Sequence, residues 1–305
     1  MADLSARGDS RLTGPSRLRT SARIGTSQPR RCLPQLALAD TLACRIPNKT
    51  MILAHAVSDA GPVRKNNEDS CAVESDLQVF VVADGMGGHS AGEVASRLAV
   101  EALVGFMRRS HDDSEISWPY GVDPVLSFHA NRLRTAINLA NRRVFRAAES
   151  HDDYTGMGTT VVAAVITGNR LTVGNVGDSR LYLMADGSLQ QLTEDDTWAA
   201  TILKQQNGHQ TVLTAHHPMR HVLTNVLGAR EQTDIHVIER DLAGGETLLL
   251  CSDGLYGVIS DREIKHMLSD SRDAARAADR LVHAAVDRGT RDNVTALVVR
   301  YEAQE

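Results

Sequence analysis

The sequence has few cysteines and no long apolar run, and each shortage argues against a class of protein. Its four cysteines form no CxxC pair, and their irregular spacing in a chain of 305 residues argues against a structural zinc site. We expect free thiols in a reducing, cytoplasmic compartment. No apolar run approaches the roughly 18 residues of a membrane span, so no membrane association is predicted.

Basic charge is also scarce once the first 49 residues are set aside. Residues 1–49 carry a balance of +6, whereas the remainder of the chain carries −11. An acidic body disfavours nonspecific nucleic-acid binding, and clustered carboxylates are what divalent cations need. We therefore expect no nucleic-acid partner, although the charge balance does not identify a substrate.

The basic segment 1–49 is rich in Ser, Thr, Arg, Gly and Pro and shows no sustained periodicity. We expect it to be disordered and to lie outside the fold, which leaves residues 50–305 as one folded domain. Its Arg-rich, Ser-rich and acid-poor composition is also typical of an organelle transit peptide. A third hypothesis is that translation starts at Met51, which the intact mass of the natively expressed protein would test.

One motif organises the rest of the sequence. An apolar strand delivers Asp84 into a glycine-rich turn that contains Gly85, Gly87 and Gly88. Glycines adopt backbone conformations that residues with side chains resist, so the carboxylate is held rigidly at the turn. We interpret Asp84 as a shared metal ligand; the alternative is that it caps a helix that starts near Ser90.

Other carboxylates stand at comparable turns. A second apolar strand enters Asp253-Gly254, and Asp292 stands at the boundary of the final strand. Two further polar turns contribute Glu68, Asp69 and Asp178. Mg²⁺ and Mn²⁺ prefer octahedral sets of oxygen ligands completed by water, and two such ions can activate a water and clamp a phosphoryl group. Arg64, in the same loop as Glu68, offers a planar fork for bidentate phosphate binding.

Apolar periodicity outlines the elements between these turns. Alternation and turn signals predict strands over 51–57, 71–74, 78–84, 159–167, 171–176, 180–184, 235–240, 247–251 and up to residue 300. Four-residue spacing predicts helices through 94–106, 133–148, 261–268 and 274–286. We expect residues 159–192 to form one β-meander. We interpret the histidine-rich stretch 194–233, the flap, as mobile and not as a metal site.

Six motifs follow one another in a fixed order. They are Ser58–Gly61 through Arg64 to Asn67–Asp69, then Val82–Gly88, Gly156–Thr160, Gly174–Arg180, Ser252–Leu255 and Arg291–Thr295. In these motifs the chain resembles the metal-dependent protein serine/threonine phosphatases, the type 2C family, in its bacterial form. Each motif is a weak signal by itself, but six in the right order leave little room for coincidence. The resemblance covers about residues 52–300.

The resemblance implies an α+β fold, a four-layer αββα sandwich of two antiparallel sheets flanked by helices. It also implies a site for two Mn²⁺ or Mg²⁺ ions at one edge, with a weaker third site. On this resemblance we expect Asp84 to bridge the two ions, and Asp253 and Asp292 to complete the protein ligands of the first. The backbone carbonyl of Gly85 is expected to bind the second ion.

The remaining roles follow from the same motifs. Glu68 and Asp69 lie near the second ion, partly through water, and Asp178 with Asp253 matches the third site. Asp178 has a structural alternative, because Gly-Asp-Ser also forms an Asx turn between strands. Arg64 matches the phosphate-binding arginine.

The activity implied is hydrolysis of phosphoserine and phosphothreonine on proteins by metal-activated water. The expected partners are phosphorylated proteins and a cognate serine/threonine kinase that the enzyme opposes, and the expected state is a monomer. Met86 stands where many eukaryotic relatives have a histidine, so we name no catalytic histidine and assign leaving-group protonation to water on the metals. The amino-acid sequence from Leu192 to Trp198 differs from the sequence that is commoner in bacterial members of the family. This difference leaves the substrate preference open.

Two competing functions remain. A phosphatase-like scaffold that binds a phosphoprotein without turnover would be marked by lost metal ligands, and none is lost. A phosphatase domain tuned to a transcription or secretion partner often carries an extra sensor or membrane domain, for which this chain has no room.

Overall fold

The structure is a computed structural model that describes residues 51–88, 91–111, 118–205 and 217–302. These residues fall within one compact unit, Ile46–Glu305. The expected disorder of residues 1–49 and the alternative helix cap near Ser90 concern residues outside the described ranges. Within those ranges no helix combines the length and the apolar character needed to cross a bilayer.

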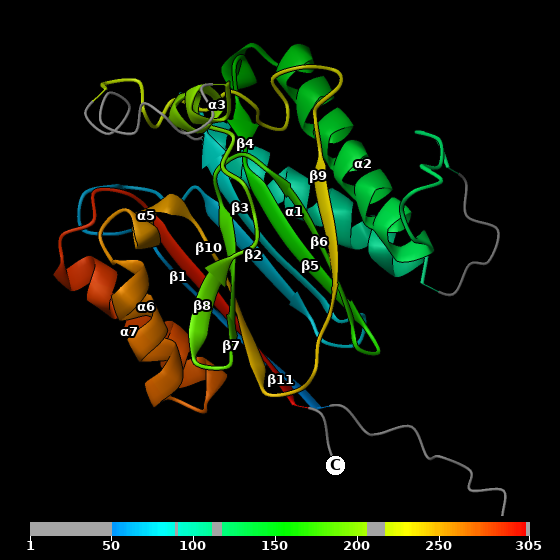
Figure 1. Cartoon of the computed structure of the whole chain (residues 1–305). Coiled ribbons are helices and arrows are strands. Elements are labelled where there is room, and N and C mark those ends of the chain that lie inside the picture. The colour runs from blue at the N-terminus through cyan, green and yellow to red at the C-terminus, as the bar shows by residue number, and fades with distance from the viewer. Residues whose placement is uncertain (1–50, 89–90, 112–117, 206–216, 303–305) are drawn as a thin grey trace, which may run out of the picture. The chain divides into compact units, whose positions relative to one another are not determined.

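Two antiparallel sheets face each other (Figure 1). The first has the strand order β1-β11-β10-β7-β8, and the second has the order β2-β3-β5-β6-β9 with the short β4 beside β3. The first sheet comprises β1 (Met51–Asp59), β7 (Arg180–Ala185), β8 (Ser188–Gln191), β10 (Glu246–Cys251) and β11 (Val294–Glu302). The second comprises β2 (Asp69–Glu74), β3 (Val79–Met86), β4 (Gly158–Thr159), β5 (Val161–Thr167), β6 (Arg170–Val176) and β9 (His236–Asp241).

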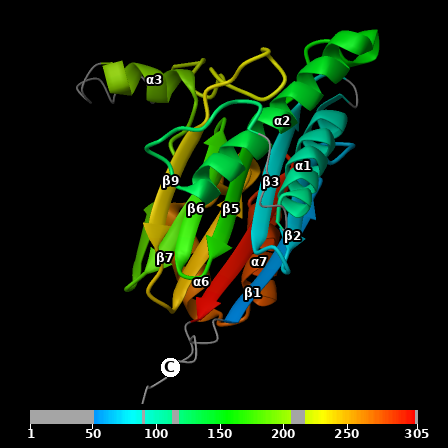
Figure 2. The same ribbon diagram turned by 90° about the vertical axis from the view of Figure 1, so that its right-hand side faces the viewer.

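Helices cover the outer face of each sheet. Figure 2 shows α1 (Ala91–Arg109) and α2 (Phe128–Ser150) in front of the second sheet, while α6 (Asp261–Asp270) and α7 (Ala274–Asp287) cover the first. Shorter elements are α3 (Trp198–Gln205), α5 (Asp253–Tyr256) and the 3₁₀ turn η1 (Asp152–Tyr154). The αββα sandwich that the resemblance implied is confirmed.

Both faces of the central strands are buried, which explains their continuous apolar runs. In β3, Val79, Val81 and Ala83 pack beneath α1 and α2, whereas Phe80 and Val82 point into the core between the sheets. Successive side chains of a strand alternate between its faces, so a strand between two layers must be apolar at every position. Burial of each large side chain stabilises the fold by about 1.5–3 kcal/mol.

Residues 159–192 do not form the single β-meander that the sequence predicted. The β5–β6 hairpin belongs to the second sheet and the β7–β8 hairpin to the first, so the chain changes sheets between β6 and β7. At this crossing Gly177 has a φ of +94°, a conformation that favours glycine. Local patterns show strands and turns but not which strands pair, so only the packing reveals the crossing.

Element boundaries near the site also differ from the prediction. β3 does not end at Asp84 but continues to Met86, because Gly85 and Met86 pair with β4. The strand predicted over 159–167 is divided at Thr160 into β4 and β5. The short helix α5, which begins at Asp253, has too few residues to produce a helical periodicity in the sequence.

Candidate metal centre

Seven of the eight residues predicted for the site line one cavity of about 210 Å³. They come from three loops, the end of β3 and the start of α5, and they are Arg64, Glu68, Asp84, Gly85, Asp178, Asp253 and Asp292. Met86, Gly87, Thr160, His221 and Leu223 complete the lining. Residues up to 228 positions apart in the sequence therefore share one space, in which the carboxylates outnumber the cationic groups.

The backbone around Asp84 is held by the neighbouring strands. Its N–H donates to Thr160 Oγ1 (3.0 Å), and its carbonyl accepts from Thr160 N and Thr159 Oγ1 (both 2.8 Å). Gly85 N donates to the Glu68 carbonyl (3.1 Å). The Thr159-Thr160 pair thus fixes the Asp84 backbone.

Space at Gly85 admits no side chain. A Cβ there would lie 2.0 Å from the carbonyl oxygen of Gly92 and 2.7 Å from that of Glu68. Such contacts with backbone atoms cannot be relieved by a side-chain rotation, so glycine is required for close approach of β3, α1 and the Glu68 loop.

Asn293 holds two loops of the site together, a role that the sequence reasoning missed. Its Oδ1 accepts from Glu68 N (2.8 Å), while its Nδ2 donates to the carbonyls of Ala60 (3.0 Å) and Asn66 (2.9 Å). The only signal in the sequence was its place within the Arg291–Thr295 motif. Asn293 therefore positions the Glu68 loop against the loop that carries Asp292.

Arg64 reaches the cavity but is engaged there with a carboxylate. Its Nη2 donates to Asp292 Oδ2 at 2.8 Å, and its Nε donates to the Arg291 carbonyl at 3.4 Å. The two side chains of the ion pair are 47% and 37% exposed, so both remain accessible to solvent and to a ligand.

Asp69 lies beneath the cavity and does not line it. It stands opposite Asp84 in the β2–β3 register. Its Oδ2 accepts hydrogen bonds from Ser252 Oγ and Thr295 Oγ1, both at 2.7 Å. These hydroxyls connect Asp69 to the strand end before Asp253 and to β11.

Burial and mutual repulsion raise the pKa values of four aspartates of this region, Asp69, Asp84, Asp178 and Asp253. Burial, followed by the charges of Asp69 and Asp253, holds the pKa of Asp84 well above its usual range. Burial likewise raises the pKa of Asp69 to about 7, of Asp178 to about 7 and of Asp253 to about 6. Removing these carboxyl groups from water is unfavourable for their charged forms unless positive charge is supplied.

Three buried carboxylate oxygens at the site lack a hydrogen-bond partner among the described residues. They are Glu68 Oε1, Asp69 Oδ1 and Asp253 Oδ1. Unpaired buried carboxylate oxygens are costly, and a divalent cation satisfies them better than any neutral donor. No three Asp, Glu, His or Cys side chains in the described ranges converge closely enough to bind an ion on their own. Backbone oxygens and water must therefore complete a shell, as is usual for Mg²⁺.

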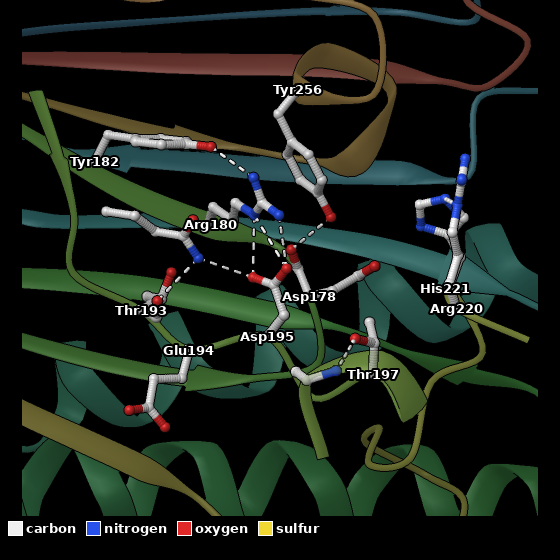
Figure 3. A network of polar contacts seen from close by, with 12 residues as sticks. Asp178, Arg180, Tyr182, Thr193, Glu194, Asp195, Thr197, Arg220, His221 and Tyr256 are labelled. Carbon is white, nitrogen blue, oxygen red and sulfur yellow. Dashed lines mark hydrogen bonds and ion pairs between the residues drawn. The ribbon is translucent and has the colours of Figure 1, made fainter. Parts of the chain in front are cut away.

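A network around Arg180 ties the Asp178 turn to the beginning of the flap (Figure 3). The Arg180 guanidinium binds Asp195 through Nε (3.0 Å) and Nη2 (2.7 Å) and lies 3.6 Å from the centroid of the Tyr256 ring. Tyr256 Oη donates to the Asp178 carbonyl (2.9 Å), and Arg180 Nη1 donates to Tyr182 Oη (2.8 Å). The planar Arg180 guanidinium therefore connects the Asp178 turn to Asp195 in the flap and to Tyr256 in α5.

Asp196 anchors the described part of the flap to the second sheet. Its Oδ2 accepts from Gly177 N (3.0 Å) and Asn225 Nδ2 (2.9 Å), and its Oδ1 is 2.9 Å from His236 Nε2. Thr224 N donates to the Asp196 carbonyl (2.8 Å). Nothing in the sequence pattern pointed to this role, because the partners come from three separate segments.

The flap histidines have different surroundings. The His217 ring stacks on Trp198, with centroids 4.2 Å apart and an interplanar angle of 24°. His221 instead lines the carboxylate cavity beside Leu223. His209 and His216 lie outside the described residues.

Comparison with known proteins agrees with the geometry. The family model described as protein phosphatase 2C matches residues 63–298. The chain belongs to this family, which confirms the resemblance carried by the six motifs.

Individual relatives show the same pattern. Serine/threonine protein phosphatase PstP of Mycobacterium tuberculosis is 39% identical over 251 residues, which cover 82% of this chain and 45% of PstP. This chain thus spans less than half the length of PstP. Serine/threonine phosphatase stp of Listeria welshimeri is 34% identical over 246 residues, which cover 79% of this chain and 93% of stp.

A solved structure supports the likeness in three dimensions. It is the catalytic domain of PstP in complex with two manganese ions, 36% identical to this chain with a TM-score of 0.69. The match covers 83% of this chain and 99% of that chain.

Proposed function

We propose that this chain is a metal-dependent protein phosphatase that hydrolyses phosphoserine and phosphothreonine with two Mn²⁺ or Mg²⁺ ions. The observation that carries the proposal is the cavity in which five carboxylates and Arg64 meet, with buried oxygens that have no hydrogen-bond partner among the described residues. Family membership and the two manganese ions of the PstP structure support it.

Asp84 is the residue we assign as the bridge between the two ions. Asp253 and Asp292 are assigned with Asp84 to the first ion, whose binding would draw these three carboxylates closer together than they lie in this structure. The Gly85 carbonyl and Glu68 are assigned to the second ion. Asp69 acts on the second ion through water, since it lies beneath the cavity and offers its free Oδ1. Asp178 with Asp253 is assigned to a third, weaker site. The ions, when bound, activate a water and neutralise the charge of the phosphoryl group.

Arg64 binds the phosphoryl group in this proposal. Its ion pair with Asp292 is half exposed, so a phosphate can compete for the guanidinium with little loss. The planar guanidinium keeps free Nη1 hydrogens while it is bound to Asp292, which orients it for a second anion.

A phosphothreonine peptide and purified protein test the activity. Hydrolysis should require Mn²⁺ and fall by at least about 100-fold in Asp84→Asn and Asp253→Asn, because each variant removes a charge that holds an ion. Asp76→Asn, at an exposed turn away from the cavity, is the matched control and should act like wild type. Unchanged activity in either site variant would contradict the assignment.

The biological setting is likewise our proposal. Phosphorylated proteins are the substrates, and the enzyme opposes a serine/threonine kinase in the cytoplasm as a monomer. Residues 50–305 form the catalytic domain, and we expect this fragment to match the full chain in activity and to elute as a monomer in size-exclusion chromatography. Reduced activity or a dimer would contradict that part, and phosphoproteomics of a deletion strain would identify the substrates.

A further inference from the structure

His221 reaches the carboxylate cavity from a segment that none of the site motifs includes. The backbone just after His221 is anchored, because Trp198 N donates to the Val222 carbonyl and Thr224 N to the Asp196 carbonyl, both at 2.8 Å. Leu223, which also lines the cavity, forms a β-bridge with Thr197. His221 is therefore held at the cavity by the same contacts that anchor the flap.

The hydrogen bond from Arg220 defines the tautomer of His221. Arg220 Nε donates to His221 Nε2 at 2.7 Å, and an arginine in a protein keeps its protons. Nε2 is consequently an acceptor, and the ring proton resides on Nδ1. Burial, followed by the charges of Arg220 and Arg180, lowers the pKa of His221 and keeps the ring neutral near pH 7.

Few hydrogen-bond donors at the cavity are uncommitted. Thr160 Oγ1 is shared with Ser179 Oγ (2.7 Å) and accepts from Asp84 N. Arg64 uses Nη2 and Nε on neighbouring acceptors. Within the described ranges His221 Nδ1 has no acceptor, so its N–H is available to a ligand in the cavity.

We propose that His221 donates a hydrogen bond from Nδ1–H to an oxygen of the substrate's phosphoryl group, as a second donor beside Arg64. This role rests on the proposed phosphatase function. The neutral ring is not the acid that protonates the leaving group, because loss of its Nδ1 proton would leave an imidazolate. The proton stays on Nδ1 throughout, and the contribution is binding and orientation of the phosphoryl group.

The role predicts which substitutions are tolerated. His221→Asn retains an N–H close to the position of Nδ1, whereas His221→Leu keeps a similar volume without a donor. With Mn²⁺ and p-nitrophenyl phosphate, the inhibition constant of inorganic phosphate should rise about tenfold in His221→Leu and stay within about twofold in His221→Asn. The loss of kcat/KM in His221→Leu should be equal for p-nitrophenyl phosphate and a phosphothreonine peptide, since both present the same phosphoryl group.

A matched control separates this role from packing of the flap. His217→Leu removes the ring stacked on Trp198 in the same segment and should leave the phosphate inhibition constant unchanged. A wild-type inhibition constant in His221→Leu, an equal loss in His221→Asn, or a loss confined to the peptide would overturn the proposal. If wild-type protein hydrolyses neither substrate with Mn²⁺, the proposed function itself fails.

A spectroscopic readout is independent of turnover. Two-bond ¹H–¹⁵N spectra of the protein should show His221 with a protonated Nδ1 and an unprotonated Nε2, and added phosphate should shift the Nδ1–H signals in the Mg²⁺-loaded protein. A ring protonated on Nε2, or signals that phosphate does not move, would overturn the role.

Discussion

Among single residues of the site, the type of a residue does not by itself reveal its role. Asp84 and Asp69 are neighbours across one strand pair, yet one lines the cavity and the other lies beneath it with two hydroxyl donors. Asn293 carries no charge and still determines how the Glu68 loop and the Asp292 loop meet. A residue's role here is decided by its depth relative to the cavity.

Gly85 provides a prediction at this scale. Gly85→Ala should destabilise the protein by about 2–3 kcal/mol and lower activity, because its Cβ would overlap the Gly92 carbonyl. Urea denaturation measures the first effect and phosphopeptide hydrolysis the second. Gly105→Ala in α1 is the control, since its Cβ meets only the flexible Arg109 side chain and alanine favours a helix by about 0.5–1 kcal/mol. Equal stability of the two variants would contradict the steric argument.

At the scale of elements, the change of sheet between β6 and β7 is what brings Asp178 to the other carboxylates. The Arg180 network then fastens this turn to the flap through Asp195 and to α5 through Tyr256. The carboxylate cavity and the flap therefore share one set of supports, and loosening one support should affect both.

Asp195→Asn tests this connection. The side chains of Arg180 and Asp195 are 21% and 17% exposed, so removing one charge leaves the other largely buried and should cost about 2–3 kcal/mol locally. Amide hydrogen exchange across residues 193–205 should accelerate. Glu194→Gln is the matched control, because its pair with Lys204 is more than half exposed on both sides and is worth less than about 1 kcal/mol. Similar exchange in both variants would contradict the network's role.

For the whole molecule, the cluster of buried carboxylates lowers the stability of the fold that the two packed sheets provide. Asp69, Asp178 and Asp253 titrate near pH 4 when unfolded, whereas burial raises their pKa values in the folded protein to about 7, about 7 and about 6, so the folded protein binds more protons within that window. Stability then falls as pH rises from about 4 to 7, because the unfolded state tolerates the charges better. Bound divalent ions reverse this sign, since they require deprotonated ligands.

The corresponding experiment is thermal unfolding between pH 5 and 7.5. With a chelator the Tm should decrease as pH rises, and with Mn²⁺ the Tm should exceed the chelator value by a margin that grows with pH. Asp178→Asn, which removes one raised pKa, should flatten the chelator curve. Parallel curves with and without Mn²⁺ would show that the cluster does not bind the ion.

The family, the order of most strands and helices, and the candidate residues of the site could all be predicted from the sequence alone. This was possible because strand and helix periodicities and the Asp-Gly turns are local properties of the chain. Asp84 was at first equally compatible with a helix cap, and only the further motifs favoured a metal ligand.

Which strands pair, and that Asp69 lies beneath the cavity, became visible only in the tertiary structure. The same holds for the contacts by which Asn293 and Arg180 position the site and Asp196 anchors the flap. The tertiary structure also brought His221 from the flap to the carboxylates. These facts depend on contacts between segments tens to hundreds of residues apart, and such contacts leave no periodic trace in a single sequence. Local motifs in the sequence identify the carboxylates, whereas the packing of the two sheets brings them together in one cavity.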